Sequence, residues 1–365
     1  MNLFPSIKEA YSKEHLNARE AQRLAEFIAF GPVVYQVSRL MIKFGILDLL
    51  RDKERTLGEV VESTGLSEYA VKVLMEASLS IGSVLIDPET DKYSLSKTGW
   101  FLLNDMATRV NIDLNNDINY EGFFHLEEAL KEGRPAGLKH FGDWPTIYEG
   151  LSSLPPKARE SWFTFDHFYS DNSFDSALEI LFSRHPSRIM DVGGNTGRFA
   201  MRCVAYDKNV RVTIVDLPQQ IGMMRKETAG KPGADRIDAC PMNLLDRDAA
   251  FPSDVNPNII WMSQFLDCFS EAEILSILKR AAAILSPESR LCIMETFWDR
   301  QRFEPAAFCL TMTSLYFTVM ANGNSKMYHS DDMTRLVLEA GMEVESISDG
   351  LGQGHSIMIC KLKNA

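Results

Sequence analysis

The chain has 365 residues, enough for two domains or for one large domain with an appendage. Hydrophobic residues make up 45% of it and charged residues 24%, proportions that are ordinary for a globular protein. The formal net charge of −12 would repel a nucleic-acid duplex or an anionic membrane surface, and no local basic patch offsets it. We therefore expect neither nucleic acid nor membrane as a partner.

Two further features predict a cytoplasmic protein. No apolar run approaches the length of a bilayer span, and the N-terminal residues lack the apolar core of a signal peptide. The cysteines are scattered through apolar segments without Cys-x-x-Cys spacing, which is typical of reduced thiols and argues against a disulfide framework or a zinc site. We expect no metal. The cysteines are Cys203, Cys240, Cys268, Cys292, Cys309 and Cys360.

The N-terminal part predicts helices followed by a hairpin. Residues 7–50 alternate charged and apolar positions at helical period, and the apolar face near their end is wide enough to bury against another chain. Capped helices are predicted over 56–62 and 67–77. Two short strands around an Asp-Pro turn are predicted within 84–95. A helix-turn-helix followed by a hairpin indicates a winged helix.

A winged helix usually suggests DNA binding, so the charge of its second helix matters. That helix carries Glu68, Lys72 and Glu76, and it has no arginine to read guanine or to hold phosphate. DNA-reading domains normally present a basic recognition face. We therefore interpret this module as a dimerisation domain. A ligand-sensing regulator that uses the winged helix is the alternative from another functional class.

Residues 106–184 are helix-rich and less regular, with several glycines and prolines that interrupt the pattern. A core between domains explains most of the aromatic residues in the second half of this segment, and an aromatic wall over a substrate would explain a few. These residues are Phe141, Trp144, Tyr148, Trp162, Phe163, Phe165, Phe168 and Tyr169.

From residue 188 onward, strands and helices alternate, which predicts a parallel sheet wrapped by helices, an α/β fold. Two late strands, within 342–347 and 356–362, close the chain. The other predicted strands are 188–193, 211–217, 236–240, 258–265 and 290–296, and the predicted helices lie near 197–206, 218–229, 270–285 and 330–340.

The segment 188–200 predicts a strand, a tight turn and a helix. Its apolar run is interrupted by Asp191 and breaks into Gly-Gly-Asn-Thr-Gly over 193–197, after which apolar residues return at helical spacing. Glycine allows the chain to lie flush against a ligand. Asn195 is one of the few residue types besides glycine that adopt the left-handed conformation at modest cost. A nucleotide belongs at such a turn.

A second acidic residue indicates which nucleotide. Asp216 ends the next apolar run, one strand-helix-strand unit downstream, where a carboxylate can accept both ribose hydroxyls. NAD and FAD need bare glycine backbone for a pyrophosphate, whereas here Asp191 precedes the first glycine by two residues and the spacing is Gly-x-Asn-x-Gly. A carboxylate suits a positively charged ligand that contains no phosphate, and this favours S-adenosylmethionine. A dinucleotide and a turn that binds nothing are the alternatives.

The chain resembles the S-adenosylmethionine-dependent O-methyltransferases of small molecules, which include caffeate-type plant enzymes and bacterial polyketide-tailoring enzymes. The likeness rests on the winged-helix front and on three motifs: Asp-Val-Gly-Gly-Asn-Thr-Gly over 191–197, Val-Asp-Leu-Pro over 215–218 and Glu-Ala-Gly-Met over 339–342. It implies a Rossmann-like methyltransferase sheet with helices on both faces. It also implies a homodimer through the N-terminal domains.

The resemblance divides the chain into three parts. Residues 1–105 would be a winged-helix-like dimerisation domain, 106–184 a helical linker that contributes to the substrate pocket, and 185–365 the catalytic domain. Within that domain, Asp191 and Gly193 would lie at the methionine end of the cofactor, Asn243 at the adenine, and Ser263 where many members carry a lysine. An asparagine can accept from the adenine amino group through its side-chain carbonyl. The implied cofactor-binding residues are Asp191, Gly193, Gly197, Asp216, Leu217, Asn243, Leu244 and Ser263.

The chain departs from the family at the catalytic base. Plant-type members read Leu-His-Asp-Trp-Ser-Asp, whereas this chain reads Leu-Asp-Cys-Phe-Ser-Glu over 266–271, which places Asp267 at the histidine position. The enzyme must align donor and acceptor and, for a phenol, remove a proton with a pKa of about 10. Aspartate, with an ordinary pKa of about 3.9, is a poorer base than histidine at about 6.5, but burial could raise that pKa.

Glu295 matches an acid that flanks the base in the family, and Met327 stands near the place of a second flanking acid. Asp267 is therefore the candidate base with Glu295 beside it, and a purely structural carboxylate is the alternative for Asp267. His167 and His329 are the other candidate bases.

The sequence thus predicts transfer of a methyl group from S-adenosylmethionine to a hydroxyl of a small aromatic or polyketide-like molecule, with release of S-adenosylhomocysteine. The missing histidine keeps one alternative open, an enzyme of this fold that has lost methylation and carries out other chemistry.

Overall fold

The computed structural model describes residues 3–363, without the side chain of Ser6. The chain forms two compact units. One comprises residues 14–117 and is called here the helical unit. The other combines the described residues before Glu14 with the chain from Ile118 onward and is called the sheet unit. No described helix is both long and apolar enough to cross a membrane.

The helical unit contains the two capped helices and the hairpin expected from the sequence. Thr56 and Ser67 accept hydrogen bonds from backbone amides of the first turns of α5 and α6, and each helix ends at a glycine with left-handed backbone. The strands pair antiparallel. The elements are α2 (Ala18–Ala29), α3 (Gly31–Lys43), α4 (Ile46–Leu49), α5 (Leu57–Thr64), α6 (Glu68–Ile81), β1 (Val84–Asp87), β2 (Lys92–Leu95), α7 (Lys97–Asn104), α8 (Met106–Leu114) and the π-helix η1 (Asn115–Asn119).

The sheet unit is built on a sheet of seven strands among the described residues, in the order β5-β4-β3-β6-β7-β9-β8. The strands are β3 (Arg188–Val192), β4 (Arg211–Asp216), β5 (Ile237–Pro241), β6 (Ile259–Ser263), β7 (Arg290–Glu295), β8 (Met342–Leu351) and β9 (His355–Leu362). The long helices are α1 (Pro5–Ser12), α9 (Leu126–Glu132), α11 (Pro156–Asp171), α12 (Phe174–Phe182), α13 (Arg198–Tyr206), α14 (Pro218–Thr228), α15 (Glu271–Ile284), α16 (Glu304–Tyr316) and α17 (Ser330–Glu339). The short ones are η2 (Gly122–His125), η3 (Ala136–His140), α10 (Ile147–Gly150), η4 (Leu151–Ser153), η5 (Ala234–Arg236), η6 (Ser253–Val255), η7 (Leu266–Cys268), η8 (Trp298–Arg300) and the π-helix η9 (Phe317–Ala321).

All predicted strands are confirmed, but the expectation of a parallel sheet is wrong at one edge. Strands β3 to β7 run parallel, whereas β9 is antiparallel to both of its neighbours, β7 and β8. The reason lies in the connection between β8 and β9, which has only three residues. A chain can return antiparallel through such a turn, but a parallel return needs a crossover of a dozen or more residues.

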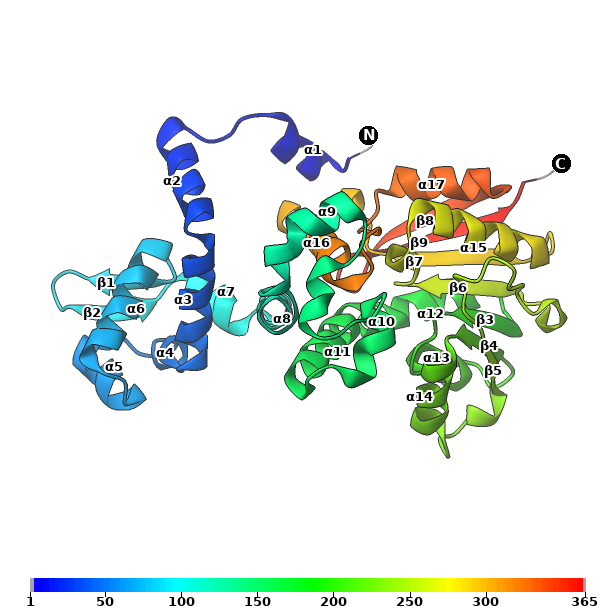
Figure 1. Ribbon diagram of the computed structural model, residues 1–365, viewed down its shortest axis with the longest axis horizontal. Coiled ribbons are helices and arrows are strands. Elements are labelled where there is room, and N and C mark those ends of the chain that lie inside the picture. Colours follow the sequence, from blue (N-terminus) through cyan, green and yellow to red (C-terminus); the bar gives the residue numbers. More distant parts are fainter. Residues whose placement is uncertain (1–2, 364–365) are drawn as a thin grey trace. The chain divides into compact units, whose positions relative to one another are not determined.

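Helices cover both faces of the sheet, as the resemblance implied (Figure 1). Successive strand residues point to opposite faces. Met190 and Val192 therefore join the core beneath α15 and α17, whereas Ile189 joins the core beneath α12, α13 and α14. Because both faces are buried, the inner strands consist almost wholly of apolar residues.

The strand order reverses beside β3, since the chain proceeds from β3 to β4 and β5 on one side and then to β6 and β7 on the other. Parallel strands that diverge in this way leave a crevice at their carboxyl ends. The register places Val192 opposite Met262, so the glycine turn after β3 lies beside the end of β6. Residues that follow these two strands therefore meet at one edge of the sheet.

Candidate active site

A cavity of about 640 Å³ lies in the sheet unit, lined by residues that follow β3 to β6 and, opposite them, by residues of α10, α11 and the segment 316–327. The structure brings six of the ten predicted site residues into its lining: Gly193, Asp216, Leu217, Asn243, Leu244 and Asp267. Side chains expected at a cofactor and at a catalytic base thus share one space.

The other four predicted residues, Asp191, Gly197, Ser263 and Glu295, are absent from that lining. Asp191 is 2% exposed and lies beneath the glycine turn, where a Cβ on Gly194 would come within 2.8 Å of its Oδ2. Gly197 is the N-cap of α13, Ser263 ends β6, and Glu295 ends β7. Their roles as site residues stay predictions.

The glycine turn has the backbone that its residues predict. Gly193 and Gly197 have φ of +77° and +80°, and Asn195 has φ of +48°, which confirms the left-handed conformation expected for it. A Cβ atom on Gly193 would lie 2.3 Å from a ring carbon of Phe265. Glycine is therefore required at this position both by the backbone angle and by the ring that faces it.

Asp216 is fixed by the turn that it faces. Its Oδ2 accepts from the amide of Asn195 at 2.8 Å, and its Oδ1 accepts from the amide of Leu217 at 2.7 Å. Burial raises its pKa to about 6, although both amide hydrogen bonds lower that pKa. Burial also raises the pKa of Asp191 to about 7, and the charge of Asp216 raises it further. A positive charge or hydroxyl donors nearby would stabilise these carboxylates.

Two polar side chains at this end of the cavity have a buried acceptor without a partner. They are Asn195, through Oδ1, and Gln264, through Oε1, and both line the cavity. Gln264 also has φ of +44°, a strained value for a residue other than glycine. Sequence reasoning missed Gln264, because a glutamine after an apolar strand carries no signal of its own.

The turn η7 holds Asp267 at the inner end of the cavity. Asp267 is 5% exposed, and its Oδ1 accepts a hydrogen bond from the thiol of Cys268 at 3.5 Å. Oε1 of Glu295 accepts from the amides of Phe265 and Leu266 at 3.1 and 2.9 Å, so Glu295 fixes the start of the turn.

Asp267 and Glu295 titrate as a pair. Burial raises the pKa of Asp267 to about 6. Burial also raises the pKa of Glu295, and the charge of Asp267 raises it further because two carboxylates so close resist double ionisation. A pKa of about 6 places Asp267 in the range where a carboxylate works as a general base near neutrality.

Helices on the other side of the cavity supply aromatic side chains. The indole of Trp162 on α11 donates to the hydroxyl of Tyr316 on α16 at 2.7 Å. On the strand side of the cavity, the rings of Phe265 and Phe269 pack edge to face, with their centroids 4.8 Å apart. Tyr148, Trp162 and Phe165 belong to the aromatic group that the sequence suggested for this wall, and all three line the cavity. Tyr316 was missed, since nothing in the sequence places the end of α16 here.

Asp166 is another residue that sequence reasoning missed. It lies one helical turn after Trp162 on α11 and lines the cavity. Burial raises its pKa to about 7, with the charge of Asp267 as the second cause. Asp166 and Asp267 therefore lie within electrostatic range of each other at the same end of the cavity.

Asn322 connects the loop after η9 to the turn that carries Asp267. Its side-chain amide donates to the carbonyl of Cys268, and its Oδ1 accepts from the amide of Asn324 at 3.2 Å and from the amide and the hydroxyl of Ser325 at 3.2 and 3.0 Å. The preceding π-helix η9 begins with Phe317, which lines the cavity. π-Helical turns are frequent at functional sites.

The two candidate histidines lie outside the lining of this cavity. His167 stacks on Phe163, and burial lowers its pKa. His329 is the N-cap of α17, and its Nδ1 accepts from the amide of Asp331 at 3.0 Å. Met327 does line the cavity, and its sulfur accepts from the hydroxyl of Thr296.

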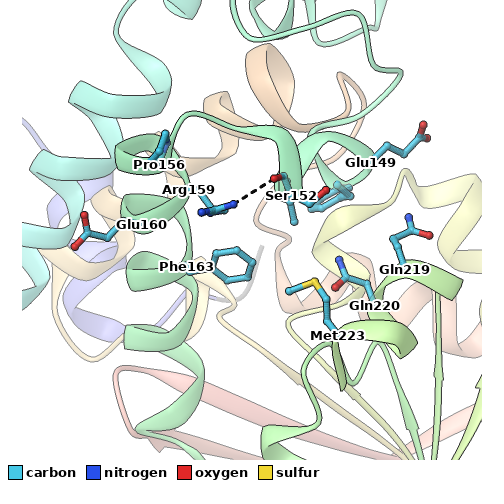
Figure 2. A pocket seen from close by; sticks show the side chains of 11 residues that line it. Glu149, Ser152, Pro156, Arg159, Glu160, Phe163, Gln219, Gln220 and Met223 are labelled. Atoms are coloured by element: carbon cyan, nitrogen blue, oxygen red, sulfur yellow. Dashed lines mark hydrogen bonds between the residues drawn. The ribbon is translucent and has the colours of Figure 1, made fainter. Parts of the chain in front are cut away.

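A second cavity, of about 570 Å³, adjoins the first and is called here the side cavity. Figure 2 shows Arg159 and Phe163 of α11 across from Gln220 and Met223 of α14. The guanidinium of Arg159 donates to the carbonyl of Ser152 at 3.3 Å. The two cavities share Tyr148, Glu149, Leu151, Gln219 and Gln220.

Charges in the main cavity are of one sign. Its described lining includes five carboxylates and no lysine, arginine or histidine. Within residues 3–363, no group of three or more histidine, cysteine, aspartate or glutamate side chains is arranged to hold a metal ion.

Comparison with known families agrees with this architecture. Residues 22–93 match a Dimerisation2-like domain, and residues 169–343 match an O-methyltransferase domain. Together the two matches span more than half of the chain. The chain belongs to the S-adenosylmethionine-dependent O-methyltransferases. One similar protein is the mitomycin biosynthesis 6-O-methyltransferase of Streptomyces lavendulae, 23% identical over 319 residues that make up 85% of this chain and 86% of that one.

Solved structures share the fold of this methyltransferase. The S-adenosylmethionine-dependent methyltransferase SibL in its apo form aligns with a TM-score of 0.70 and 20% identity over 93% of this chain and 98% of its own. The neocarzinostatin O-methyltransferase NcsB1, in complex with S-adenosylmethionine and a 2-hydroxy-5-methyl naphthoic acid, aligns with a TM-score of 0.65 and 18% identity over 90% of this chain and 96% of its own.

The residues of the main cavity fit a sulfonium nucleoside. Asn195 and Gln264 offer buried acceptors without partners, and Asp216 has a raised pKa that a cation would lower. A dinucleotide fits poorly, because its pyrophosphate would face carboxylates without a cationic side chain in the lining.

Proposed function

We propose that this methyltransferase binds S-adenosylmethionine in the main cavity and methylates a hydroxyl of a small aromatic or polyketide-like molecule. One observation carries the proposal: a single cavity joins the turn at Gly193 and Asp216 to the buried carboxylate of Asp267, with aromatic rings opposite. Those rings suit a planar acceptor. The printed names of its relatives, which include antibiotic-pathway O-methyltransferases, support the same substrate class.

The cofactor-binding residues would act along the edge of the sheet. Asp216 accepts the ribose hydroxyls, since each of its oxygens retains a free lone pair beside its amide hydrogen bond. The side-chain carbonyl of Asn243 accepts a hydrogen bond from the adenine amino group. Leu217 and Leu244 cover the adenine ring. Asp191, Gly197 and Ser263 support the turn and the strand ends from behind.

When bound, the cofactor supplies a methyl group on a positively charged sulfur. Asp267 would take the proton from the acceptor hydroxyl as its oxygen receives this methyl group, and S-adenosylhomocysteine would be the second product. Glu295 orients Asp267 through the turn η7, because it accepts hydrogen bonds from the amides of Phe265 and Leu266 at the start of that turn. The aromatic rings and the burial of Asp267 exclude water, which raises the pKa of this carboxylate toward that of a useful base.

The helical unit supports a homodimer formed through a winged-helix module. Helix α2 has no buried residue among those described, and four apolar side chains remain exposed on or next to it: Leu24, Phe27, Ile28 and Phe30. An apolar surface of this kind is typical of an interface. We also propose a cytoplasmic location, because the cysteines are scattered through apolar segments without the spacing of a disulfide framework. The acidic charge balance of the chain supports neither nucleic acid nor membrane as a partner.

Calorimetric titration with S-adenosylhomocysteine tests the cofactor site. Asp216→Ala should weaken binding by at least about tenfold, since a hydrogen bond to a charged group contributes about 1.5–3 kcal/mol. Asp238→Ala is the matched control, because Asp238 lies on the neighbouring strand β5 and pairs with Arg211 on the surface. Absence of binding to the wild type, or equal affinity in Asp216→Ala, would rule out this site.

Mass spectrometry of products tests the reaction. We expect an acceptor incubated with protein and S-adenosylmethionine to gain the mass of one methylene group, with S-adenosylhomocysteine formed in equal amount. A product that gains oxygen or loses a group, with the cofactor unchanged, would favour the alternative of an enzyme that has lost methylation.

A further inference from the structure

Three of the five carboxylates in the described lining of the main cavity, Asp166, Asp216 and Asp267, belong to its two functional ends. Asp216 lies at the cofactor end, beside the glycine turn. Asp166 and Asp267 lie at the acceptor end, where both of their charges raise the pKa of the Tyr316 hydroxyl that lies near them. In the two cavities together, the one cationic side chain among the described lining residues is Arg159 of the side cavity (Figure 2).

Asp166 makes no ion pair with a lysine or arginine among the described residues, although the nearby charge of Arg198 lowers its pKa. Its ion-pair contact among the described residues is with its neighbour His167, whose Nδ1 lies 3.7 Å from Oδ2. Burial and the charge of Arg198 lower the pKa of His167, which disfavours the charged imidazole beside Asp166. Arg198 itself pairs with Asp171 at 3.1 Å.

Other polar groups of the lining also lack partners. Gln220 is 8% exposed, and its Oε1 has no hydrogen-bond partner. The hydroxyl of Tyr148 is buried near the thiol of Cys268 but makes no hydrogen bond of good geometry. A buried polar group without a partner costs free energy, so the acceptor oxygen of Gln220 indicates a ligand that donates a hydrogen bond, while the hydroxyl of Tyr148 can either donate or accept.

Aromatic side chains line the same cavity as Asp166, whose side chain is 28% exposed. Trp162, Phe165, Tyr316 and Phe317 all line this end of the cavity. Aromatic rings attract a cation through their quadrupole, most strongly where water is excluded. They give no such stabilisation to an anion, which would also meet the charges of Asp166 and Asp267 at close range. The surroundings thus favour a positively charged group and disfavour a carboxylate.

We propose that the methyl acceptor is an aromatic hydroxyl compound that carries a protonated amine, with the ammonium group against Asp166 and the hydroxyl against Asp267. This inference rests on the proposed function, because it assigns the acceptor of the same site. It also separates this chain from the structurally similar NcsB1, whose complex contains a naphthoic acid. Aromatic carboxylates are poor ligands of this cavity.

Three naphthols that differ in one substituent test the assignment: an aminomethyl, a hydroxymethyl and a carboxylate derivative. Each is titrated into the full-length protein saturated with S-adenosylhomocysteine. We expect the amine to bind at least about tenfold more tightly than the carboxylate, with the neutral compound between them. The reason is that the interaction energies of a cation and of an anion with a carboxylate at short range differ by this much or more. A carboxylate that binds as tightly as the amine, or no binding of any naphthol, overturns the inference.

Asp166→Asn removes the charge and keeps the shape. We expect the affinity for the amine to fall to that for the neutral naphthol, while the affinity for S-adenosylhomocysteine stays unchanged. Glu127→Gln is the control, because Glu127 of α9 lies outside the lining of both cavities, is exposed and pairs with Lys131. A loss of S-adenosylhomocysteine affinity in Asp166→Asn would assign Asp166 to the cofactor ammonium and overturn the inference. Failure of the wild type to bind S-adenosylhomocysteine would instead refute the proposed function.

Discussion

The two ends of the main cavity are built in different ways. The cofactor end consists of residues that directly follow consecutive parallel strands, such as Gly193, Asp216 and Asn243. The acceptor end brings together α11, the turn η7 and the end of α16, which are far apart in the chain. A motif that lies beside its own strand keeps its geometry in any protein of this fold. A wall made from distant helices can change with each side chain, which allows one fold to serve many acceptors.

The largest effect is expected at the acceptor end, where Asp267→Asn removes the proposed base. We expect kcat to fall by about 10²- to 10⁴-fold, the usual contribution of a general base, with little change in affinity for S-adenosylhomocysteine. Steady-state kinetics and calorimetry together measure both quantities. Glu271→Gln is the control, since Glu271 is part of the same loop and helix start but pairs with Arg335. Equal kcat in Asp267→Asn and the wild type would make Asp267 a structural carboxylate.

The next largest effect is expected at the cofactor end, where Gly193→Ala should lower both the stability of the protein and its affinity for S-adenosylhomocysteine. The new Cβ would lie 2.3 Å from the ring of Phe265 and would hold a φ of +77°, so either the ring or the turn must move. We expect a loss of about 1–3 kcal/mol in the free energy of unfolding, the usual cost of such strain, and at least tenfold weaker S-adenosylhomocysteine binding. Urea unfolding and calorimetry measure these changes.

Gly230→Ala provides the comparison for Gly193→Ala. Gly230 has a similar φ of +73°, but a Cβ placed there meets no atom within 4 Å. The Gly230→Ala variant should therefore lose stability through backbone strain alone and keep its affinity for S-adenosylhomocysteine. Equal affinity losses in both variants would show that the contact with Phe265 has no part in the effect.

The pH dependence of the reaction should show that ionised carboxylates are needed at both ends. Burial raises the pKa of Asp216 and of Asp267 to about 6. Both groups act in the charged form, which is lost as the pH falls through this value. We expect kcat/KM to fall by up to about a hundredfold for each pH unit well below pH 6, since each of the two required carboxylates contributes about a tenfold loss as it is protonated. A rate that is constant between pH 7 and pH 5 would contradict this assignment.

The smallest change is expected from Asn322→Ala, which tests whether distant segments of the acceptor end are held together by single side chains. The variant loses the hydrogen bond to the carbonyl of Cys268 and those to Ser325. We expect kcat to fall by a few-fold and the free energy of unfolding by about 1 kcal/mol, the usual net contribution of a hydrogen bond. An unchanged kcat with lowered stability would limit Asn322 to a structural role.

Much of the fold could be predicted from the sequence because its signals are local. Caps at Thr56 and Ser67 fixed the starts of two helices, and the apolar run before Gly193 fixed the strand and the turn. The antiparallel edge departs from the parallel pairing that alternating strands and helices predict. The short turn after β8 decides the direction of β9, as no crossover fits into three residues.

The candidate site divides in the same way. Asp216 was identified from its position at the end of an apolar run, and Asp267 from its place in a resembling motif. Asp166, Tyr316 and Gln264 were not identified, because each enters the cavity through packing between segments that share no sequence pattern. A lone aspartate on a helix has no signal until the structure shows which charges and rings face it.

The amino-acid sequence by itself determined the strand-turn-helix at Gly193, the carboxylate that follows the next strand, and the family to which they belong, since these depend on backbone angles and apolar periodicity over short stretches. The tertiary structure alone decided that Asp166 and Asp267 meet in one cavity without a cation in its described lining. Burial and mutual repulsion, which raise the pKa of a carboxylate, arise only when distant segments come together and exclude water.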